Sequence, residues 1–234
     1  MRRVTLVAMI VIGMCGSALV AQDIVPIVGH GSRALLFSFS GLANLGAGTF
    51  DGGIGGRYYL SEALSVRGGL QLASASQTTP ANAPSGQQGI DGSTSASSFG
   101  LSGAAEWHMG KSRVIPFVGA GLMYSHTTTE SKTVETGNPP PDQTTRKNRG
   151  TGENVNGVTY VSGTLFQIFG LAGVEFFLTK ELSLSAEYQL GYGSVTRPDQ
   201  EVSSGSTTTT TKMGSGTGLG ISTAGSLTLA VYIN

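Results

Sequence analysis

The chain has 234 residues, with 14 lysines and arginines against 14 aspartates and glutamates, so its formal net charge is zero. A neutral chain has no electrostatic attraction for nucleic acid, and we expect no nucleic-acid partner. The charged fraction of 12% and the 36 glycines are unusual for a helical enzyme, and no long segment has apolar residues at helical spacing. The composition therefore predicts an all-β protein.

The N-terminal segment has the features of a secretory signal peptide. A pair of arginines precedes an apolar stretch over 4–15, and small residues offer a cleavage site after Ala21. The apolar stretch is shorter than the roughly 20 residues that a membrane-spanning helix needs. We predict three segments: a cleaved signal peptide over 1–21, a periplasmic leader over 22–32 and a single domain over 33–234.

The only cysteine, Cys15, lies inside the predicted signal peptide, which leaves the mature chain without a thiol for a disulfide, a metal site or a nucleophile. An acylated lipoprotein cysteine is the alternative, although Met14 before it fits such a site poorly. The histidines form no metalloprotease pattern, and short glycine motifs such as "GSGTGLG" lack the dinucleotide-binding spacing. We expect no cofactor and no metal ion.

After the leader, the sequence consists of segments in which apolar and polar residues alternate, as they do along a β-strand with two different faces. Most of these segments are close to the roughly 9 to 11 residues with which a tilted strand crosses a bilayer. We predict eight strands, at 34–42, 53–60, 64–74, 98–109, 114–128, 163–178, 182–195 and 225–234.

The links between these segments alternate in length. Three of them, "SEA", "GKSR" and "TKE", are tight charged turns, and the links between these turns are long. This alternation predicts an eight-stranded antiparallel up-and-down transmembrane β-barrel with short periplasmic turns and long extracellular loops. A soluble β-sandwich is the alternative, but its Greek-key links have no reason to sort by length.

The three longest links, 75–97, 129–162 and 196–224, are rich in threonine, serine, glycine, asparagine and proline. Such segments cannot bury enough apolar surface to fold alone. We predict that they are mobile external loops.

Charged residues inside the strands should face the lumen if the apolar face of each strand meets lipid. The alternation assigns five charged residues to the lumen: Arg57, Arg67, Glu106, Glu175 and Glu187. Four of them lie three residues from the turn end of their strand and should form one layer, with Glu187 slightly higher.

An eight-stranded barrel has an interior that side chains can fill, so these charges are expected to pair into a salt-bridged plug. The alternative is a charged constriction in a narrow conduit, for which inward glycines such as Gly100 and Gly121 would leave room. His108 lies near the same end, and we predict that it has a structural hydrogen-bonding role.

Aromatic residues gather at both ends of the predicted strands, as expected for the two interfacial girdles of a membrane barrel. The predicted interfacial aromatics are Tyr58, Tyr59, Trp107, Phe176 and Phe177 near the turns, with Tyr124 and Tyr192 near the loops.

One short segment, "YSHTTTE", has the composition of a nucleophilic triad in Ser125, His126 and Glu130. Ser125 and His126 are adjacent, so in a strand they point to opposite faces and cannot hydrogen-bond without a bulge. We therefore expect no catalytic residues and no enzymatic activity.

The segments "PFVGAGLMYSHT", "FGLAGVEFFLTKELSLSAEYQLGYG" and "GSLTLAVYIN" resemble the small outer-membrane β-barrel family, typified by the transmembrane domain of outer membrane protein A and by opacity-type surface proteins. The resemblance implies a multi-pass barrel in the outer membrane of a Gram-negative cell. Family members often end on an aromatic residue that the assembly machinery recognises, whereas this chain ends on Asn234. No peptidoglycan-binding domain is expected after the last strand.

These patterns together predict a non-enzymatic surface scaffold that presents polar loops for envelope integrity, adhesion or ligand capture. The expected partners are outer-membrane lipids and lipopolysaccharide, the barrel assembly machinery, and a host or surface ligand of the loops, with the barrel itself a monomer. A narrow porin-like channel is the second interpretation. A lipid hydrolase at the barrel rim and a secreted β-sandwich are less favoured.

Overall fold

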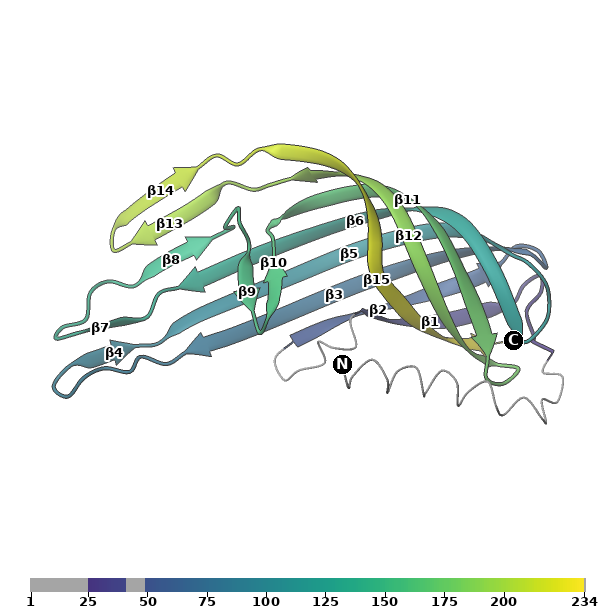
Figure 1. Cartoon of the computed structure of the whole chain (residues 1–234), viewed down its shortest axis with the longest axis horizontal. Coiled ribbons are helices and arrows are strands. Elements are labelled where there is room, and N and C mark those ends of the chain that lie inside the picture. The colour runs from purple at the N-terminus through teal and green to yellow at the C-terminus, as the bar shows by residue number, and fades with distance from the viewer. Residues whose placement is uncertain (1–24, 41–48, 234) are drawn as a thin grey trace, which may run out of the picture.

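The computed structural model describes residues 25–40 and 49–233. The predicted signal peptide, the first residues of the leader, residues 41–48 with the end of the first predicted strand and most of the first link, and Asn234 lie outside the described residues. Helices with the length and hydropathy needed to cross a membrane are absent from the described part of the chain. The described chain is built almost entirely of strands (Figure 1).

Eight long strands form a closed antiparallel ring, which confirms the predicted barrel and excludes the sandwich. Consecutive members of the ring pair with each other, β1 pairs with β15, and the ring is complete through β6 and β11. The eight strands are β1 (Arg33–Ser40), β2 (Thr49–Tyr59), β3 (Leu64–Thr79), β5 (Gly92–His108), β6 (Val114–Lys132), β11 (Gly163–Phe177), β12 (Leu182–Thr196) and β15 (Ser215–Ile233).

The alternation of residue types matches the two faces of the wall. Along β5, Phe99, Leu101 and Trp107 are exposed on the outside, whereas Glu106 and His108 are buried inside. The same holds for the other strands with described side chains. The apolar outer face is the surface that lipid would cover. The inner face carries the buried charges and hydroxyls together with buried apolar side chains such as Ile115, Phe117 and Phe177.

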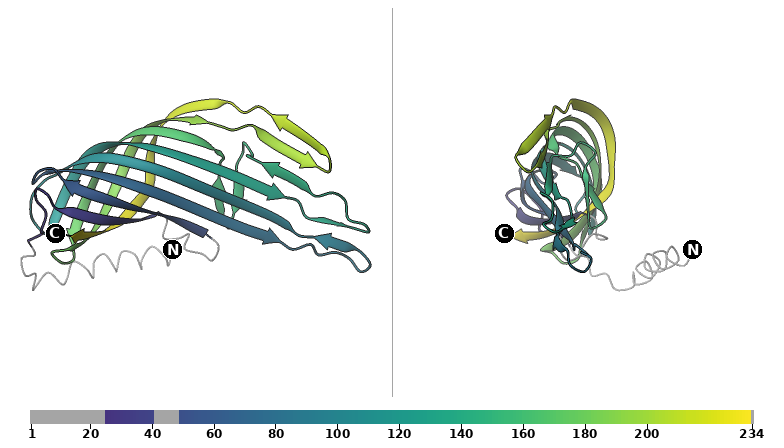
Figure 2. Two further views of the ribbon diagram at one scale, coloured as in Figure 1. Left: turned by 180° about the vertical axis from the view of Figure 1, so that it is seen from behind. Right: turned by 90° about the vertical axis from the view of Figure 1, so that its left-hand side faces the viewer.

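The strands extend further from the turns than the alternation predicted. β3 continues five residues past the predicted end at Ser74, and β15 begins at Ser215, ten residues before its predicted start. Beyond Leu72 on β3 and Phe99 on β5, the outward side chains change from apolar residues to serines. The wall therefore continues as a polar sheet above the apolar belt (Figure 2).

The long links contain regular secondary structure, which corrects the prediction that they do not fold. They contain seven short strands: β4 (Gln88–Ile90), β7 (Glu135–Gly137), β8 (Thr144–Lys147), β9 (Glu153–Val155), β10 (Val158–Tyr160), β13 (Gln200–Ser204) and β14 (Thr207–Thr211). β8, β13 and β14 continue the sheet outward from β6. Threonine is β-branched and favours strands. Because neighbouring strands accept and donate its backbone hydrogen bonds, these segments can form strands while burying little apolar surface.

The ring strands beyond the apolar belt, together with β8, β13 and β14, form what we call the projecting sheet. The hairpin of β9 and β10 folds onto its inner side. Val155 is fully buried against Ala75 and Ala96, and Asn156 donates hydrogen bonds to Ser76 and Gln77 of β3. The hairpin crosses β3, β5 and β6 in Figure 1. These contacts hold it at the mouth of the barrel.

The described part of the leader folds back onto the turn end of the barrel. Ile27 and Val28 pack against buried side chains of the lumen, and the backbone of Gly31 donates a hydrogen bond to Tyr59. The Ser32 hydroxyl donates to the Ile27 carbonyl at 2.8 Å. The leader therefore covers this end of the lumen.

Candidate functional site

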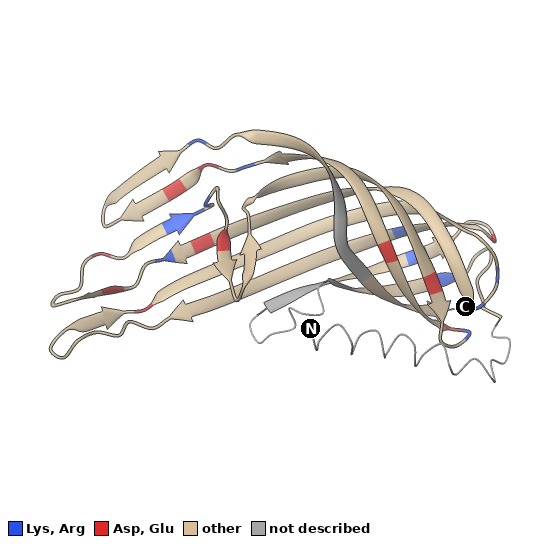
Figure 3. Ribbon diagram, in the orientation of Figure 1, with Lys and Arg blue, Asp and Glu red and all other residues tan. Residues whose placement is uncertain are grey.

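Five charged residues of the barrel strands gather near the turn end, whereas other charged residues lie at the opposite end (Figure 3). Arg57 comes from β2, Arg67 from β3, Glu106 from β5, Glu175 from β11 and Glu187 from β12. All five side chains lie on the inner face, and only Arg67 is more than slightly exposed. We call this set of residues the charged layer.

Arg57 is the centre of the charged layer. Its Nη1 atom donates to Glu175 Oε2 at 2.9 Å and to the Tyr232 hydroxyl at 3.1 Å. Its Nε atom lies 3.0 Å from Glu106 Oε2 as an ion pair without hydrogen-bond alignment. The side chains of Arg57 and of its two charged partners are fully buried, so these charges are compensated by one another, by Arg67 and by neighbouring polar groups.

Arg67 connects the remaining carboxylate, Glu187, to Glu106. Its two terminal nitrogens donate to both oxygens of Glu187, at 2.7 and 2.9 Å. Such a two-point contact fixes the planar groups relative to each other. Nη1 of Arg67 is also 3.0 Å from Glu106 Oε1, so Glu106 bridges the two arginines.

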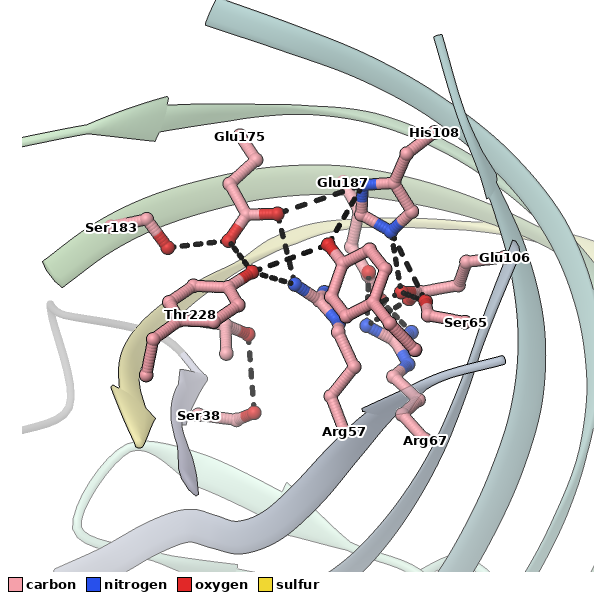
Figure 4. A network of polar contacts seen from close by, with 12 residues as sticks. Ser38, Arg57, Ser65, Arg67, Glu106, His108, Glu175, Ser183, Glu187 and Thr228 are labelled. Carbon is pink, nitrogen blue, oxygen red and sulfur yellow. Dashed lines mark hydrogen bonds and ion pairs between the residues drawn. The ribbon is translucent and has the colours of Figure 1, made fainter. Parts of the chain in front are cut away.

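Hydroxyl and imidazole groups surround the carboxylates (Figure 4). Glu175 accepts hydrogen bonds from Ser183 and, at 2.9 Å, from the Tyr232 hydroxyl. His108 Nε2 lies 3.2 Å from Glu106 Oε2, and its ring stacks on Phe117. His108 therefore belongs to the network and contacts no open space.

Two aromatic residues lie elsewhere than predicted. Tyr59 and Phe177 are fully buried in the lumen, where they pack with Tyr232, and are not interfacial. Each follows an outward aromatic, Tyr58 or Phe176, and adjacent residues of a strand point to opposite faces. The Tyr59 hydroxyl lies 3.3 Å from His108 Nδ1, which makes it a member of the network.

A cluster of buried apolar residues, which we call the apolar stopper, extends from the turn end to the level of the charged layer, where Leu36 reaches the cavity described below. It consists of Ala34, Leu36, Tyr59, Ile115, Phe177, Ala230 and Tyr232, with Ile27 and Val28 of the leader against them. At the opposite side of the layer is a cavity of about 250 Å³, lined by Arg67, Glu187, Gln71, Gln167 and Phe169 among others. Together, the stopper and the charged layer separate this cavity from the turn end.

Most outward aromatics form two groups near the ends of the apolar belt, and the exposed Tyr188 lies between them on β12. Tyr58, Trp107 and Phe176 lie near the turns, and the Arg113 guanidinium is 4.7 Å from the centre of the Phe176 ring. Tyr124 and Tyr192 lie at the other end. Phe99 and Phe166 are also exposed there, and Phe166 lies opposite Tyr124 across β6 and β11. The prediction of interfacial aromatics left out Phe99 and Phe166, although the alternation in the sequence places both on the outward face.

The triad candidates do not form a catalytic arrangement. Ser125 and His126 are consecutive residues of the regular strand β6, and the described register there has no bulge. His126 Nδ1 instead lies 2.9 Å from the Thr164 hydroxyl of β11. Within residues 25–40 and 49–233, no three potential ligand side chains gather as a metal site.

A family model described as "Outer membrane protein beta-barrel domain" matches residues 8–211. Three solved structures resemble the fold: neisserial surface protein A, the N-terminal β-barrel domain of Pseudomonas aeruginosa OprF, and Ail, the attachment invasion locus protein of Yersinia pestis. Sequence identities are 17%, 12% and 10%, with TM-scores of 0.39, 0.36 and 0.38. The matches cover 86%, 88% and 88% of this chain and 93%, 99% and 100% of the others. No curated protein gives a significant match.

Proposed function

Because the chain belongs to the outer membrane protein β-barrel domain family, as its sequence resemblance predicted, we propose that it is a non-enzymatic scaffold of the outer membrane. The scaffold displays the projecting polar sheet at the cell surface. Its lumen is closed and conducts no ions. The contribution to the cell is then adhesion, ligand capture or envelope integrity through the displayed sheet.

The closed lumen is the observation that carries the proposal. Glu106 and Glu175 are fully buried, and Arg57 lies between them with its side chain fully buried. Opening a water path here would separate ion pairs whose loss costs about 3–5 kcal/mol when one partner is left behind. The stopper of Tyr59, Phe177 and their neighbours is a second barrier.

The polarity of the outer wall supports surface display. The apolar belt ends at residues such as Leu72 and Phe99, and the same strands continue beyond it with exposed serines and threonines. The links between strands at the opposite end are short turns. Outer-membrane barrels place short turns in the periplasm and long extensions outside the cell.

Two surfaces, the apolar belt and the projecting sheet, define the proposed partners. Outer-membrane lipids and lipopolysaccharide surround the apolar belt, and the barrel assembly machinery receives the last strand, β15. The closed ring leaves no strand of the wall for a neighbour in the same membrane, so the barrel is a monomer there. The projecting sheet is the surface for a host or surface ligand.

Conductance in planar lipid bilayers tests the proposal. The wild-type chain is expected to give no steady conductance, whereas Arg57→Ser with Glu106→Ser removes an ion pair without changing the net charge and is expected to leak. A steady wild-type conductance as large as that of a leaking double variant would contradict the closed scaffold. It would favour the narrow channel, for which the cavity of about 250 Å³ is the supporting observation.

A further inference from the structure

The strand β14, Thr207–Thr211, is the last strand of the projecting sheet. It pairs with β13, and the sheet order ends there. All five threonines are exposed, and they lie far from the turn end of the barrel (Figure 1). Within the described chain, the side of β14 away from β13, which we call the free edge, has no strand beside it.

The backbone groups at the free edge can be identified from the turn. A two-residue turn at Gly205 and Ser206, with φ of 58° at Gly205, joins the two strands. The residue pair next to such a turn, here Ser204 and Thr207, is joined by backbone hydrogen bonds. From there, hydrogen-bonded and non-hydrogen-bonded pairs alternate along the hairpin. Thr207, Thr209 and Thr211 therefore bond to β13, whereas Thr208 and Thr210 point their N–H and C=O groups to the free edge.

A side-chain contact agrees with this assignment. The hydroxyls of Ser203 and Thr208 are 2.9 Å apart across the hairpin. Side chains are closest in the pairs that lack backbone hydrogen bonds, which is the kind of pair that Ser203 and Thr208 form.

The opposite side of the projecting sheet shows that an edge of this fold can be covered. Past Ala75, the described residues of β2 give β3 no partner, but Asn156 donates to the Ser76 carbonyl at 3.2 Å and to the Gln77 side chain at 3.1 Å. Natural sheets also protect their edges with charged residues or proline. β14 has neither along its length, and Lys212 follows only after the run ends.

We propose that β14 pairs in antiparallel fashion with β14 of a second copy of this chain on an opposing cell surface. A run of five identical residues is self-complementary, because threonine meets threonine in any antiparallel register. The run has no charge, so the approach of two copies brings no repulsion within it. The contact makes the scaffold a homotypic cell–cell adhesin.

The direction of β14 explains why the second copy belongs to another cell. The strand lies along the projecting sheet and runs from the turn at its tip back toward the barrel (Figure 2). Copies in one membrane have the same orientation, so their β14 strands would meet in parallel. Copies in two facing membranes point toward each other, and their strands meet antiparallel. Each contact is short and weak, but many copies on each surface act together.

This inference rests on the proposed surface display, and cell clustering tests both. Non-adherent cells expressing the full chain are expected to cluster. Thr208→Pro with Thr210→Pro removes both free-edge N–H groups and leaves the bonds to β13, so clustering should slow roughly tenfold or more. Thr208→Val with Thr210→Val keeps those N–H groups and should cluster like the wild type.

Mixing experiments identify the partner. Labelled proline-variant cells mixed with wild-type cells are expected to stay outside the clusters, because pairing needs an intact edge on both sides. Equal clustering of the proline variant, loss of clustering in the valine variant, or variant cells within the clusters would each overturn the pairing. The detergent-gel shift on heating verifies that each variant forms its barrel.

Trypsin treatment of intact cells separates the two proposals, since Lys212 follows β14 directly. Cleavage at Lys212 without clustering would overturn the pairing and leave the displayed scaffold standing. Absence of both cleavage and clustering would contradict the surface display, and the pairing with it.

Discussion

Replacing Arg57 with methionine should destabilise the barrel strongly. The variant keeps much of the side-chain volume but removes the cation that lies 2.9 Å from Glu175 and 3.0 Å from Glu106. Glu106 keeps Arg67 as a partner at 3.0 Å, whereas Glu175 keeps only hydroxyl donors and the more distant His108. Leaving one such buried charge without its partner costs about 3–5 kcal/mol.

The matched variant is Arg67→Met. The Arg67 side chain is 14% exposed, and Glu187 would still accept a hydrogen bond from Gln189 at 2.7 Å. Arg67→Met should therefore lower the free energy of unfolding by less than Arg57→Met. Adding Glu175→Gln to Arg57→Met removes the unpaired charge and should recover part of the stability. These differences can be measured by urea unfolding in lipid vesicles, followed by the fluorescence of Trp107, the single tryptophan.

Two outcomes would refute this reasoning. If Arg57→Met lowers the free energy of unfolding by less than about 1 kcal/mol, Arg57 does not compensate a buried charge on Glu175, because a change of that size is typical of exposed ion pairs. If Arg57→Met and Arg67→Met lose equal amounts, the difference in burial between the two sides of the layer has no energetic effect.

Three further outcomes are expected. Gly119→Ala would place a Cβ atom 2.3 Å from a backbone carbonyl oxygen of β5, and should lower the free energy of unfolding by about 1–3 kcal/mol. The control Gly170→Ala, on the outer face, should change it by less than about 0.5 kcal/mol in the same unfolding assay. Trp107, 55% exposed on the outer face, should be quenched by brominated lipids, and unquenched fluorescence would contradict a lipid-facing wall. The hydrogen bond from Lys111, and then its charge, lower the pKa of Glu62, so NMR titration should show that pKa rise in Lys111→Met. The stabilisation from this pair is present above the ordinary glutamate pKa and is lost as the pH falls through the lowered value.

The sequence alone determined the faces and the general architecture of this protein. A strand repeats every two residues, so the alternation in "AAEWHM" places Glu106 and His108 on one side and Trp107 on the other, whatever the neighbours are. The parity of link lengths was enough for an up-and-down barrel, because short turns at one end impose antiparallel neighbours.

The alternation failed where the outcome depended on neighbouring strands. It offered no means of ending β3 at Thr79, because the polar part of this strand is held by pairing with β5 and not by apolar burial. Similarly, the threonine run of β14 became a strand because β13 lies beside it. The aromatic count at the strand ends did not separate Tyr59 and Phe177 from their outward neighbours, although their parity would have.

Only the tertiary structure decided which charges meet. Arg57 and Arg67 lie directly opposite each other on adjacent strands, and their carboxylate partners come from β5, β11 and β12. The period of a strand fixes the face of a residue but not its register against another strand. Register is set by the turns and by closure of the ring, which brought β6 to β11 and so placed Glu175 within reach of Arg57.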